Sequence, residues 1–586
     1  MATTSPKNPG SKATSVPTPR FGRRLLILGA MGTAMAAATG ERLANWQVLE
    51  AGDLAATAGV QQRNEQIIAS RRGAILSRDG TAMALSLQVD RLIGSPNVIT
   101  EYDTADVARY LAEVLDVPYE QIMAKIGDPS LAYVVVAEDL EPDQSAQIRQ
   151  AMRRGKIGGF RLEPVARRIY PGNFLGSHLI GFVDGAGKGH YGVESFYDHE
   201  LTGRPGLVIS DQDPRGRTIP VGNYDPLPPV NGATLVLTMD RTIQRIAEQE
   251  LEGALARFGS SSGSILVVDP RSGDILGMAN RPAFNPTRLG TYAEIGEAFI
   301  NPAVSLIYDP GSTFKIMTMA AGLDAGVIGP GTRHNLPGVY EYWGLEFKNW
   351  DERTYPDQDM VSVLANSSNT GAIFVADQLG ADAYYDYIRS FGFGETSGVD
   401  LAGEVRGILK SRGSLSWYPS DLAANSFGQS ISTTPIQMAM AFGAVANGGL
   451  LLRPRAVGRI ATDAGDVVEP AITETRRVLR PTTSRTLIDM MYQAEHSTPG
   501  NLALSQRYST VGKTGTAEIS AVGGGLLPEQ TIASYIGFGP RENPQILISV
   551  KIDKPRTGTW GSRVASPIFR QMVDRVFEYL RIPAVA

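Results

Sequence analysis

The second half of the 586-residue chain holds three short polar motifs in a fixed order. They are a Ser-x-x-Lys, a Ser-x-Asn and a Lys-Thr-Gly-Thr, formed by Ser312 and Lys315, by Ser367 and Asn369, and by Lys513, Thr514, Gly515 and Thr516. Residues three apart on a helix lie on one face, so a lysine amine can stand beside a serine hydroxyl. A neutral lysine there could take the serine's proton and create an acyl-transfer nucleophile. A second Ser-x-Asn at 95–97 shows that each motif alone arises by chance, whereas the ordered set does not.

The third motif is predicted to lie on a strand of an antiparallel sheet. Two apolar runs, 531–538 and 545–552, follow it, the first after a Gly-rich turn, which is the pattern of consecutive antiparallel strands. On a strand, Thr514 and Thr516 share one face, whereas Gly515 has no side chain and would let a substrate backbone come close.

The first motif is predicted to open a helix. Pro310-Gly311 punctuates the chain just before an apolar stretch at 314–323. Ser312 would then lie at the positive end of the helix dipole. That position favours a developing oxyanion and disfavours protonation of Lys315.

The ordered set resembles the signature of serine β-lactamases and penicillin-binding proteins. From about residue 42 to the C-terminus, the chain resembles a class B penicillin-binding protein of the division-specific type. The other segments that carry this resemblance are 72–80, 267–274, 391–394, 425–430 and 446–449. One departure is Ser77, where the family usually has Asp.

The resemblance implies an α+β fold with a penicillin-binding/serine β-lactamase-like transpeptidase domain, in which helices cover an antiparallel sheet. An elongated, mixed α/β pedestal and a single N-terminal transmembrane helix are expected to precede it. The predicted domains are a pedestal at 49–228, of the dimerisation type, and a transpeptidase domain at 233–586, joined by a Pro-rich linker at 225–232. No glycosyltransferase module is expected before them.

Within these domains, a helix is predicted at 105–115, and the first catalytic strands at 264–269 and 274–279. The last helix is predicted at 567–580, with Ser566 as its N-cap and Pro567 at its first position.

The resemblance also implies a role for each motif residue. Ser312 would attack the penultimate D-Ala of a peptidoglycan stem peptide that ends in D-Ala-D-Ala, with Lys315 as general base. Ser367 would relay a proton to the leaving amine, and Asn369 would hold the peptide amide and the lysine. The terminal carboxylate would be bound by Lys513, Thr514 and Thr516, beside Gly515. The backbone N–H groups of Ser312 and Thr516 would form the oxyanion hole.

The N-terminus is predicted to be a disordered cytoplasmic tail at 1–24 and a transmembrane anchor at 25–48. The uncharged stretch at 25–40 spans only about 24 Å as a helix, short of a hydrocarbon core of about 30 Å. The helix is therefore expected to continue past Glu41 and Arg42 toward Trp46. Arg20, Arg23 and Arg24 would stay inside by the positive-inside rule. The competing interpretation is a signal peptide cleaved near the small residues at 34–38.

Composition excludes several classes of function. The chain has no cysteine, which removes disulfides and zinc–thiolate sites, and its five histidines form no metal-binding motif. A net charge of −5 gives no basic footprint for nucleic acid. The implied mechanism requires no metal or cofactor.

The resemblance implies a peptidoglycan D,D-transpeptidase of the bacterial cytoplasmic membrane, working outside the membrane, at the division septum. Its expected partners are stem peptides as donor and amine acceptor, β-lactams as covalent inhibitors, a membrane-embedded SEDS-family glycosyltransferase and other division proteins. The alternatives are an elongation-specific transpeptidase, a D,D-carboxypeptidase or β-lactamase, a β-lactam sensor, and a catalytically idle division scaffold.

Overall fold

The computed structural model describes residues 21–52, 63–99, 102–211, 225–289, 292–410, 412–520 and 526–585. The chain divides into two compact units, one made of residues 1–69 and 205–229 and the other of residues 70–204 and 230–586. The predicted domain division between residues 228 and 233 stays a prediction.

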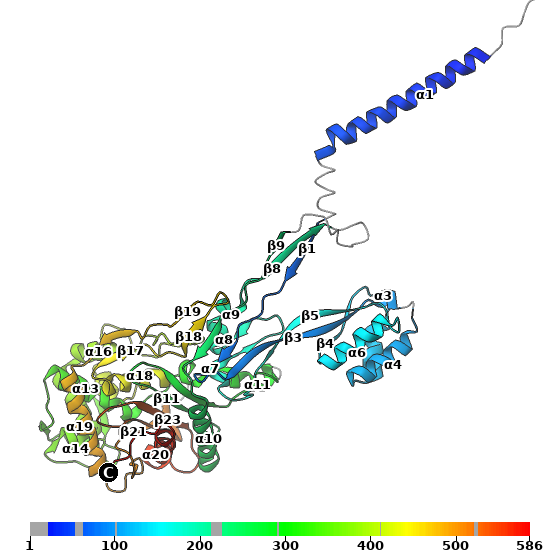
Figure 1. Cartoon of the computed structure of the whole chain (residues 1–586). Coiled ribbons are helices and arrows are strands. Elements are labelled where there is room, and N and C mark those ends of the chain that lie inside the picture. The colour runs from blue at the N-terminus through cyan, green and yellow to red at the C-terminus, as the bar shows by residue number, and fades with distance from the viewer. Residues whose placement is uncertain are drawn as a thin grey trace, which may run out of the picture. The chain divides into compact units, whose positions relative to one another are not determined.

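The first unit contains a long helix and a small sheet (Figure 1). Helix α1 (Phe21–Ala44) continues into a π-helical turn, η1 (Asn45–Leu49), so helical backbone extends past Glu41 and Arg42 as expected. The antiparallel sheet has the order β1-β8-β9, formed by β1 (Arg63–Ile68), β8 (Gly206–Asp211) and β9 (Asp225–Leu227). Among the described residues, no helix combines the length and the apolar character that a membrane crossing needs. Residues 1–20, most of the predicted tail, lie outside the described part.

A seven-stranded sheet of the second unit joins distant parts of the sequence. Its order is β19-β18-β10-β2-β3-β4, with β5 also paired to β3, and β2 and β10 run parallel. The strands are β2 (Ile75–Leu76), β3 (Ala82–Gly94), β4 (Val134–Leu140), β5 (Phe160–Ile169), β10 (Thr234–Leu237), β18 (Val457–Ala461) and β19 (Val467–Val468).

Helices pack against β3 and β4 around a small apolar core that includes Leu92, Leu111 and Ile148. They are α3 (Pro96–Ile99), α4 (Thr104–Leu115), α5 (Tyr119–Ile126) and α6 (Pro142–Arg153). Helix α4 confirms the helix predicted at 105–115. Short elements follow in the chain: α7 (Ser177–Ile180), β6 (Phe182–Val183), β7 (Gly189–His190), α8 (Gly192–Phe196) and α9 (Asp198–Thr202).

The sheet that carries the third motif has five antiparallel strands in the order β12-β11-β23-β22-β21. They are β11 (Ser262–Val268), β12 (Ile275–Arg281), β21 (Val511–Ser520), β22 (Leu526–Gly539) and β23 (Ile546–Asp553). Residues alternate between its two faces: Ile265 and Val267 face one core, and Leu266 and Val268 face another. Both faces are covered, so the α+β fold predicted from the sequence is confirmed.

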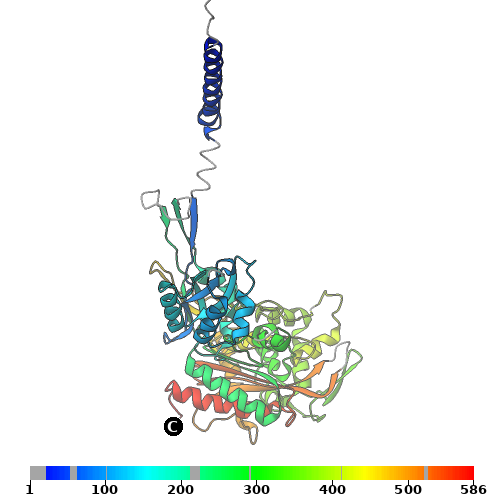
Figure 2. The same ribbon diagram turned by 90° about the vertical axis from the view of Figure 1, so that its right-hand side faces the viewer.

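On one face of this sheet, α10 (Arg241–Phe258) lies beside α20 (Gly561–Tyr579), as Figures 1 and 2 show. The rest of the unit is largely helical and contributes to the core on the other face. Its helices are α11 (Tyr292–Phe299), α12 (Pro302–Ser305), η2 (Gly311–Phe314), α13 (Lys315–Ala325), α14 (Met360–Ala365), α15 (Asn369–Leu379), α16 (Ala381–Ser390), α17 (Pro419–Ser426), α18 (Pro435–Ala446) and α19 (Pro481–Ser497). Three two-stranded pairs complete it: β13 (Arg333–His334) with β16 (Gln358–Asp359), β14 (Val339–Tyr342) with β15 (Leu345–Lys348), and β17 (Leu450–Leu452) with β20 (Glu474–Arg477).

The predicted start of the last helix is wrong. Helix α20 begins at Gly561, and Pro567 lies inside it, while Ser566 is buried and caps nothing. The earlier start is stabilised from outside the helix, because the Gly561 N–H, an end group with no partner within the helix, donates to Thr516 Oγ1 at 2.9 Å. A sequence pattern cannot reveal such a tertiary cap.

Candidate active site

Ser312 lies on the single 3₁₀ turn η2, which leads directly into α13. The turn is fixed by the Gly311 N–H, which donates to the Gly428 carbonyl at 2.9 Å. Ser312 is half-buried and lines a cavity of about 1240 Å³. Its hydroxyl makes no hydrogen bond to any described residue, so it is free to meet a ligand. The sequence placed Ser312 in the first turn of an α-helix, and the structure places it one turn earlier.

Lys315, the first residue of α13, is 1% exposed. Its Nζ donates to Asn369 Oδ1 at 2.6 Å, lies 3.2 Å from Ser367 Oγ and also donates to the Ser367 carbonyl. Burial lowers the pKa of Lys315 well below its ordinary value, and the nearby charge of Lys513 lowers the pKa further. The lowered pKa favours the neutral amine, which is the form that a general base requires.

Ser367 connects the two lysines of the motifs. Its Oγ is 3.2 Å from Lys315 Nζ and 3.0 Å from Lys513 Nζ. Ser367 lies between α14 and α15 and has a left-handed backbone with φ of 52°. A non-glycine residue in that region costs of order 1–3 kcal/mol, a cost typical of residues that serve a site. The hydroxyl is thus held where it can pass a proton between neighbours.

Asn369 opens α15 and is positioned by a residue that the motifs did not reveal. Its Nδ2 donates to the Lys348 carbonyl at 2.6 Å, which turns Oδ1 toward Lys315. The side chain of Asn349, buried in the loop after β15, accepts hydrogen bonds from the Asn369 N–H at 2.8 Å and the Thr370 N–H at 3.2 Å. Asn349 therefore caps α15 from another part of the chain. No spacing in the sequence indicates that contact.

Lys513 lies on β21, the edge strand of the five-stranded sheet, and is also buried. Besides Ser367, its Nζ contacts the Thr514 carbonyl at 3.2 Å and Thr514 Oγ1 at 3.3 Å. Burial lowers the pKa of Lys513 to about 8, which leaves it mostly cationic at pH 7. The lysine therefore offers a positive charge to an anionic group in the cavity.

The last two residues of the third motif hold the site together. Thr516 Oγ1 accepts the hydrogen bond from Gly561, and Thr516 also lines the cavity. A Cβ on Gly515 would lie 2.4 Å from Ser534 Oγ and 3.0 Å from the Pro310 carbonyl. The space beside Gly515 is therefore filled by the protein's own chain. The sequence had predicted that a substrate backbone would come close there. Its missing side chain lets β21 pack against the turn that carries Ser312.

The structure gathers the motif residues around one cavity, with no hydrogen bond between the Ser312 hydroxyl and Lys315 among the described residues. Lys315, Ser367, Asn369 and Lys513 form a continuous hydrogen-bonded chain beside the cavity, which Ser312, Thr514 and Thr516 also line. Among the described residues, no group of three or more His, Asp or Glu side chains is placed to hold a metal ion. The arrangement suits nucleophilic catalysis by a serine with a neutral lysine as base.

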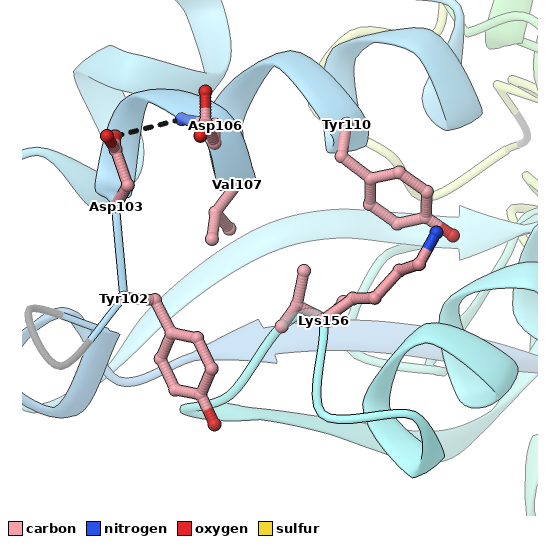
Figure 3. A pocket seen from close by; sticks show the side chains of 7 residues that line it. Tyr102, Asp103, Asp106, Val107, Tyr110 and Lys156 are labelled. Atoms are coloured by element: carbon pink, nitrogen blue, oxygen red, sulfur yellow. Dashed lines mark hydrogen bonds between the residues drawn. The ribbon is translucent and has the colours of Figure 1, made fainter.

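A smaller hollow of about 320 Å³ lies beside α4 (Figure 3). Its Asp103 is occupied as the N-cap of α4, accepting from the backbone N–H of Ala105 at 2.9 Å and of Asp106 at 3.1 Å. Tyr110 donates to the Gln147 carbonyl at 3.1 Å. No motif residue lines this hollow, so the chemistry belongs to the larger cavity.

Two family models match the chain. The penicillin binding protein transpeptidase domain matches residues 263–574, which is more than half of the chain, and the penicillin-binding protein dimerisation domain matches residues 67–237. The peptidoglycan D,D-transpeptidase FtsI of Escherichia coli strain K12 is 29% identical over 568 residues, covering 96% of this chain and 92% of that protein. Stage V sporulation protein D of Bacillus subtilis strain 168 is 30% identical over 512 residues, covering 85% and 76%.

The chain belongs to the class B penicillin-binding proteins. Its fold also matches the crystal structure of a peptidoglycan synthetase from Bifidobacterium adolescentis, with a TM-score of 0.72, 26% identity and coverage of 90% of this chain and 98% of that one. In this class B penicillin-binding protein, the transpeptidase match includes all three motifs, whereas the dimerisation match includes the hollow of Figure 3.

The sequence motifs did not reveal a second residue that lines the cavity of this penicillin-binding protein. Glu495, on α19, is buried and lines the catalytic cavity. Its carboxyl accepts a hydrogen bond from the hydroxyl of Tyr535 on β22. The only signal in the sequence is an acidic residue in a helix that precedes the third motif, which is too common to single out.

Proposed function

We propose that this protein is a peptidoglycan D,D-transpeptidase that cross-links stem peptides through an acyl-enzyme on Ser312. The observation that carries the proposal is the position of Ser367 Oγ, within hydrogen-bonding distance of both Lys315 and Lys513, beside the cavity that Ser312 lines. The similarity to proteins named as peptidoglycan D,D-transpeptidases supports it.

In acylation, neutral Lys315 accepts the Ser312 proton, and Ser312 Oγ forms a bond to the carbonyl carbon of the penultimate D-Ala. The backbone N–H groups of Ser312 and Thr516 stabilise the oxyanion. In a comparable enzyme, removing one such donor costs about 3 to 4 kcal/mol of transition-state stabilisation. The bond to the terminal D-Ala then breaks. Its nitrogen takes a proton through Ser367, and the free D-Ala leaves.

In the second half-reaction, the amine of a neighbouring stem peptide attacks the ester. A proton passes from that amine through the same Lys315 and Ser367 system to Ser312 Oγ as the ester bond breaks. The products are an amide cross-link and the free enzyme. In the earlier acylation step, the donor is oriented by Lys513, Thr514 and Thr516, because its terminal carboxylate meets the cationic Lys513 before it leaves with D-Ala.

β-Lactams are proposed to acylate Ser312 in the same way. For the cellular setting, we propose a single-pass anchor at 25–48 that places the catalytic domain outside the bacterial cytoplasmic membrane. The proposed role is septal, in partnership with a SEDS-family glycosyltransferase and other division proteins. The form of the second motif, Ser367-Ser368-Asn369, and the segments 537–540 and 565–569 favour the division type over the elongation type.

Depletion of the protein from its host tests the septal role. The expected result is filamentous cells of normal width, because lateral growth continues while septal cross-linking stops. Microscopy after repression of the gene measures this, with re-expression of the wild-type chain as the control. Rounded cells would assign the protein to elongation, and unchanged growth and shape would contradict both roles.

A further inference from the structure

Asp309 lies three residues before Ser312 and has no part in the proposed chemical steps. Its carboxylate is half-buried, and both of its oxygens bind one distant segment. Oδ2 accepts a hydrogen bond from the backbone N–H of Ser430 at 3.2 Å, and Oδ1 accepts one from the hydroxyl of Ser432 at 3.0 Å. Asp309 thus joins the turn that carries Ser312 to residues 428–432, a wall segment of the same cavity.

The wall segment packs directly on the turn of the nucleophile. Gln429 and Ser430 line the cavity together with Ser312. The Gly428 carbonyl accepts a hydrogen bond from the Gly311 N–H at 2.9 Å, and a Cβ on Gly428 would lie 2.2 Å from the Gly311 carbonyl oxygen. A shift of the wall segment would therefore reach the residue next to Ser312.

The peptide group between Gln429 and Ser430 is held at both ends. Its carbonyl accepts a hydrogen bond from Asn425 Nδ2 at 2.9 Å, and its N–H is the group that donates to Asp309. Ser430 has a left-handed backbone with φ of 58°. A residue with a side chain keeps that conformation only where its surroundings hold it. The bond to Asp309 supplies part of that restraint.

The two ends of the wall segment are fixed without Asp309. At one end, Gly428 is bonded to Gly311. Just past the other end, the N–H of Tyr308 donates to the Thr433 carbonyl at 2.9 Å, and the N–H of Thr433 donates back at the same distance. Loss of the carboxylate should therefore leave the segment in place and free only its middle.

We propose that Asp309 is a positioning residue that holds the peptide group between Gln429 and Ser430 against the turn of Ser312, and so keeps Ser312 aligned for attack. This inference rests on the proposed function, in which Ser312 is acylated. The donor's carboxylate is assigned to Lys513, whose hydrogen bonds go to other residues. The limiting rate of acylation should therefore depend on Asp309, and the affinity for the donor should not.

The test measures acylation of the full-length protein by benzylpenicillin at increasing concentrations, which separates the limiting rate from the dissociation constant. Asp309→Ala removes both acceptors. It is expected to lower the limiting rate about 10- to 100-fold and to change the dissociation constant by less than about threefold, because misalignment affects the reacting atoms. Asp309→Asn keeps one oxygen acceptor, and we expect a smaller loss of about three- to tenfold in the limiting rate.

A second pair of variants tests the restraint on Ser430. Glycine adopts a left-handed backbone without strain, so Ser430→Gly needs less support from Asp309. In the Ser430→Gly background, adding Asp309→Ala is expected to lower the limiting rate by only about threefold or less. Asp128→Ala is the matched control, since Asp128 also binds a serine backbone N–H and a serine hydroxyl, both from Ser130. That change should leave both constants unaltered.

An unchanged limiting rate in Asp309→Ala would overturn the inference, as would an equal loss in both Ser430 backgrounds. A purely structural role would give a lower melting temperature and a smaller reactive fraction, with the wild-type limiting rate in that fraction, and would also overturn it. The same criteria apply to Asp309→Asn where Asp309→Ala does not fold. Failure of the proposed function is distinguishable, because wild type itself would then form no adduct on Ser312.

Discussion

Replacing Ser312 by Ala is expected to abolish cross-linking, lowering the rate of donor turnover by at least about 10⁴-fold. The reason is that Ser312 is the cavity hydroxyl followed three residues later by a buried lysine whose pKa is well below its ordinary value. Ser367 is engaged with both lysines, at 3.2 and 3.0 Å, and has a backbone fixed in the left-handed region. It cannot take over as nucleophile without losing its contacts to both lysines.

The assay for this variant measures formation of cross-linked peptide from a stem-peptide donor and an amine acceptor. The fold should be intact, because the Ser312 hydroxyl makes no hydrogen bond that its removal would break. Ser130→Ala, which removes an exposed hydroxyl bonded to Asp128, is the matched control and should keep full activity. Turnover by Ser312→Ala within tenfold of wild type would refute the assignment of the nucleophile.

Replacing Lys315 by Met is expected to lower the acylation rate by about 10³-fold or more, within or above the range for loss of a general base. Methionine fills much of the same volume but cannot accept the serine proton. Lys348→Met is the matched control, since Lys348 also lines the cavity but is exposed and paired with Glu346 and Glu352. That variant should react at nearly the wild-type rate.

The stability of Lys315→Met follows from two opposed effects. At pH 7, Lys315 binds a proton in the unfolded chain. In the native protein its pKa is lowered, so it holds that proton much less well. The native state is therefore destabilised as pH falls below about 10.5, and methionine removes this cost. Against that, Asn369 Oδ1 and the Ser367 carbonyl lose their donor, which costs about 1–3 kcal/mol per buried group. We expect a melting temperature within a few degrees of wild type.

Calorimetry and acylation rates on the same preparation distinguish loss of the base from loss of the fold. A wild-type acylation rate in Lys315→Met would contradict the role of Lys315 as base. A drop in melting temperature large enough to unfold the protein at the assay temperature would show instead that Lys315 is chiefly structural. A gain in activity above pH 9 would point to another group as the base.

Local sequence patterns were sufficient for the strands of the sheet that carries the third motif. The apolar runs at 531–538 and 545–552 correspond to β22 and β23, and the strands predicted at 264–269 and 274–279 correspond to β11 and β12. Alternation with a period of two is set by the strand itself, so it survives in any tertiary context. Element type was therefore predictable where the pattern was strong.

Tertiary contacts account for what the sequence could not reveal. Helix α20 starts at Gly561 because Thr516 caps it from a strand, and Gly515 faces the protein's own chain because β21 packs on the turn of Ser312. Asn349 holds Asn369, and Glu495 meets Tyr535, through hydrogen bonds between segments far apart in the chain. Each depends on the folded arrangement, which local spacing does not encode.

Mass spectrometry of the full-length protein after exposure to benzylpenicillin tests the central claim most directly. Ser312 Oγ is expected to open the β-lactam ring and keep the whole inhibitor, so the intact mass should increase by one benzylpenicillin, and peptide mapping should place the adduct on Ser312. The Ser312→Ala variant should show no increase. An unmodified Ser312 in the wild-type protein, or an adduct on any other residue, would contradict the account.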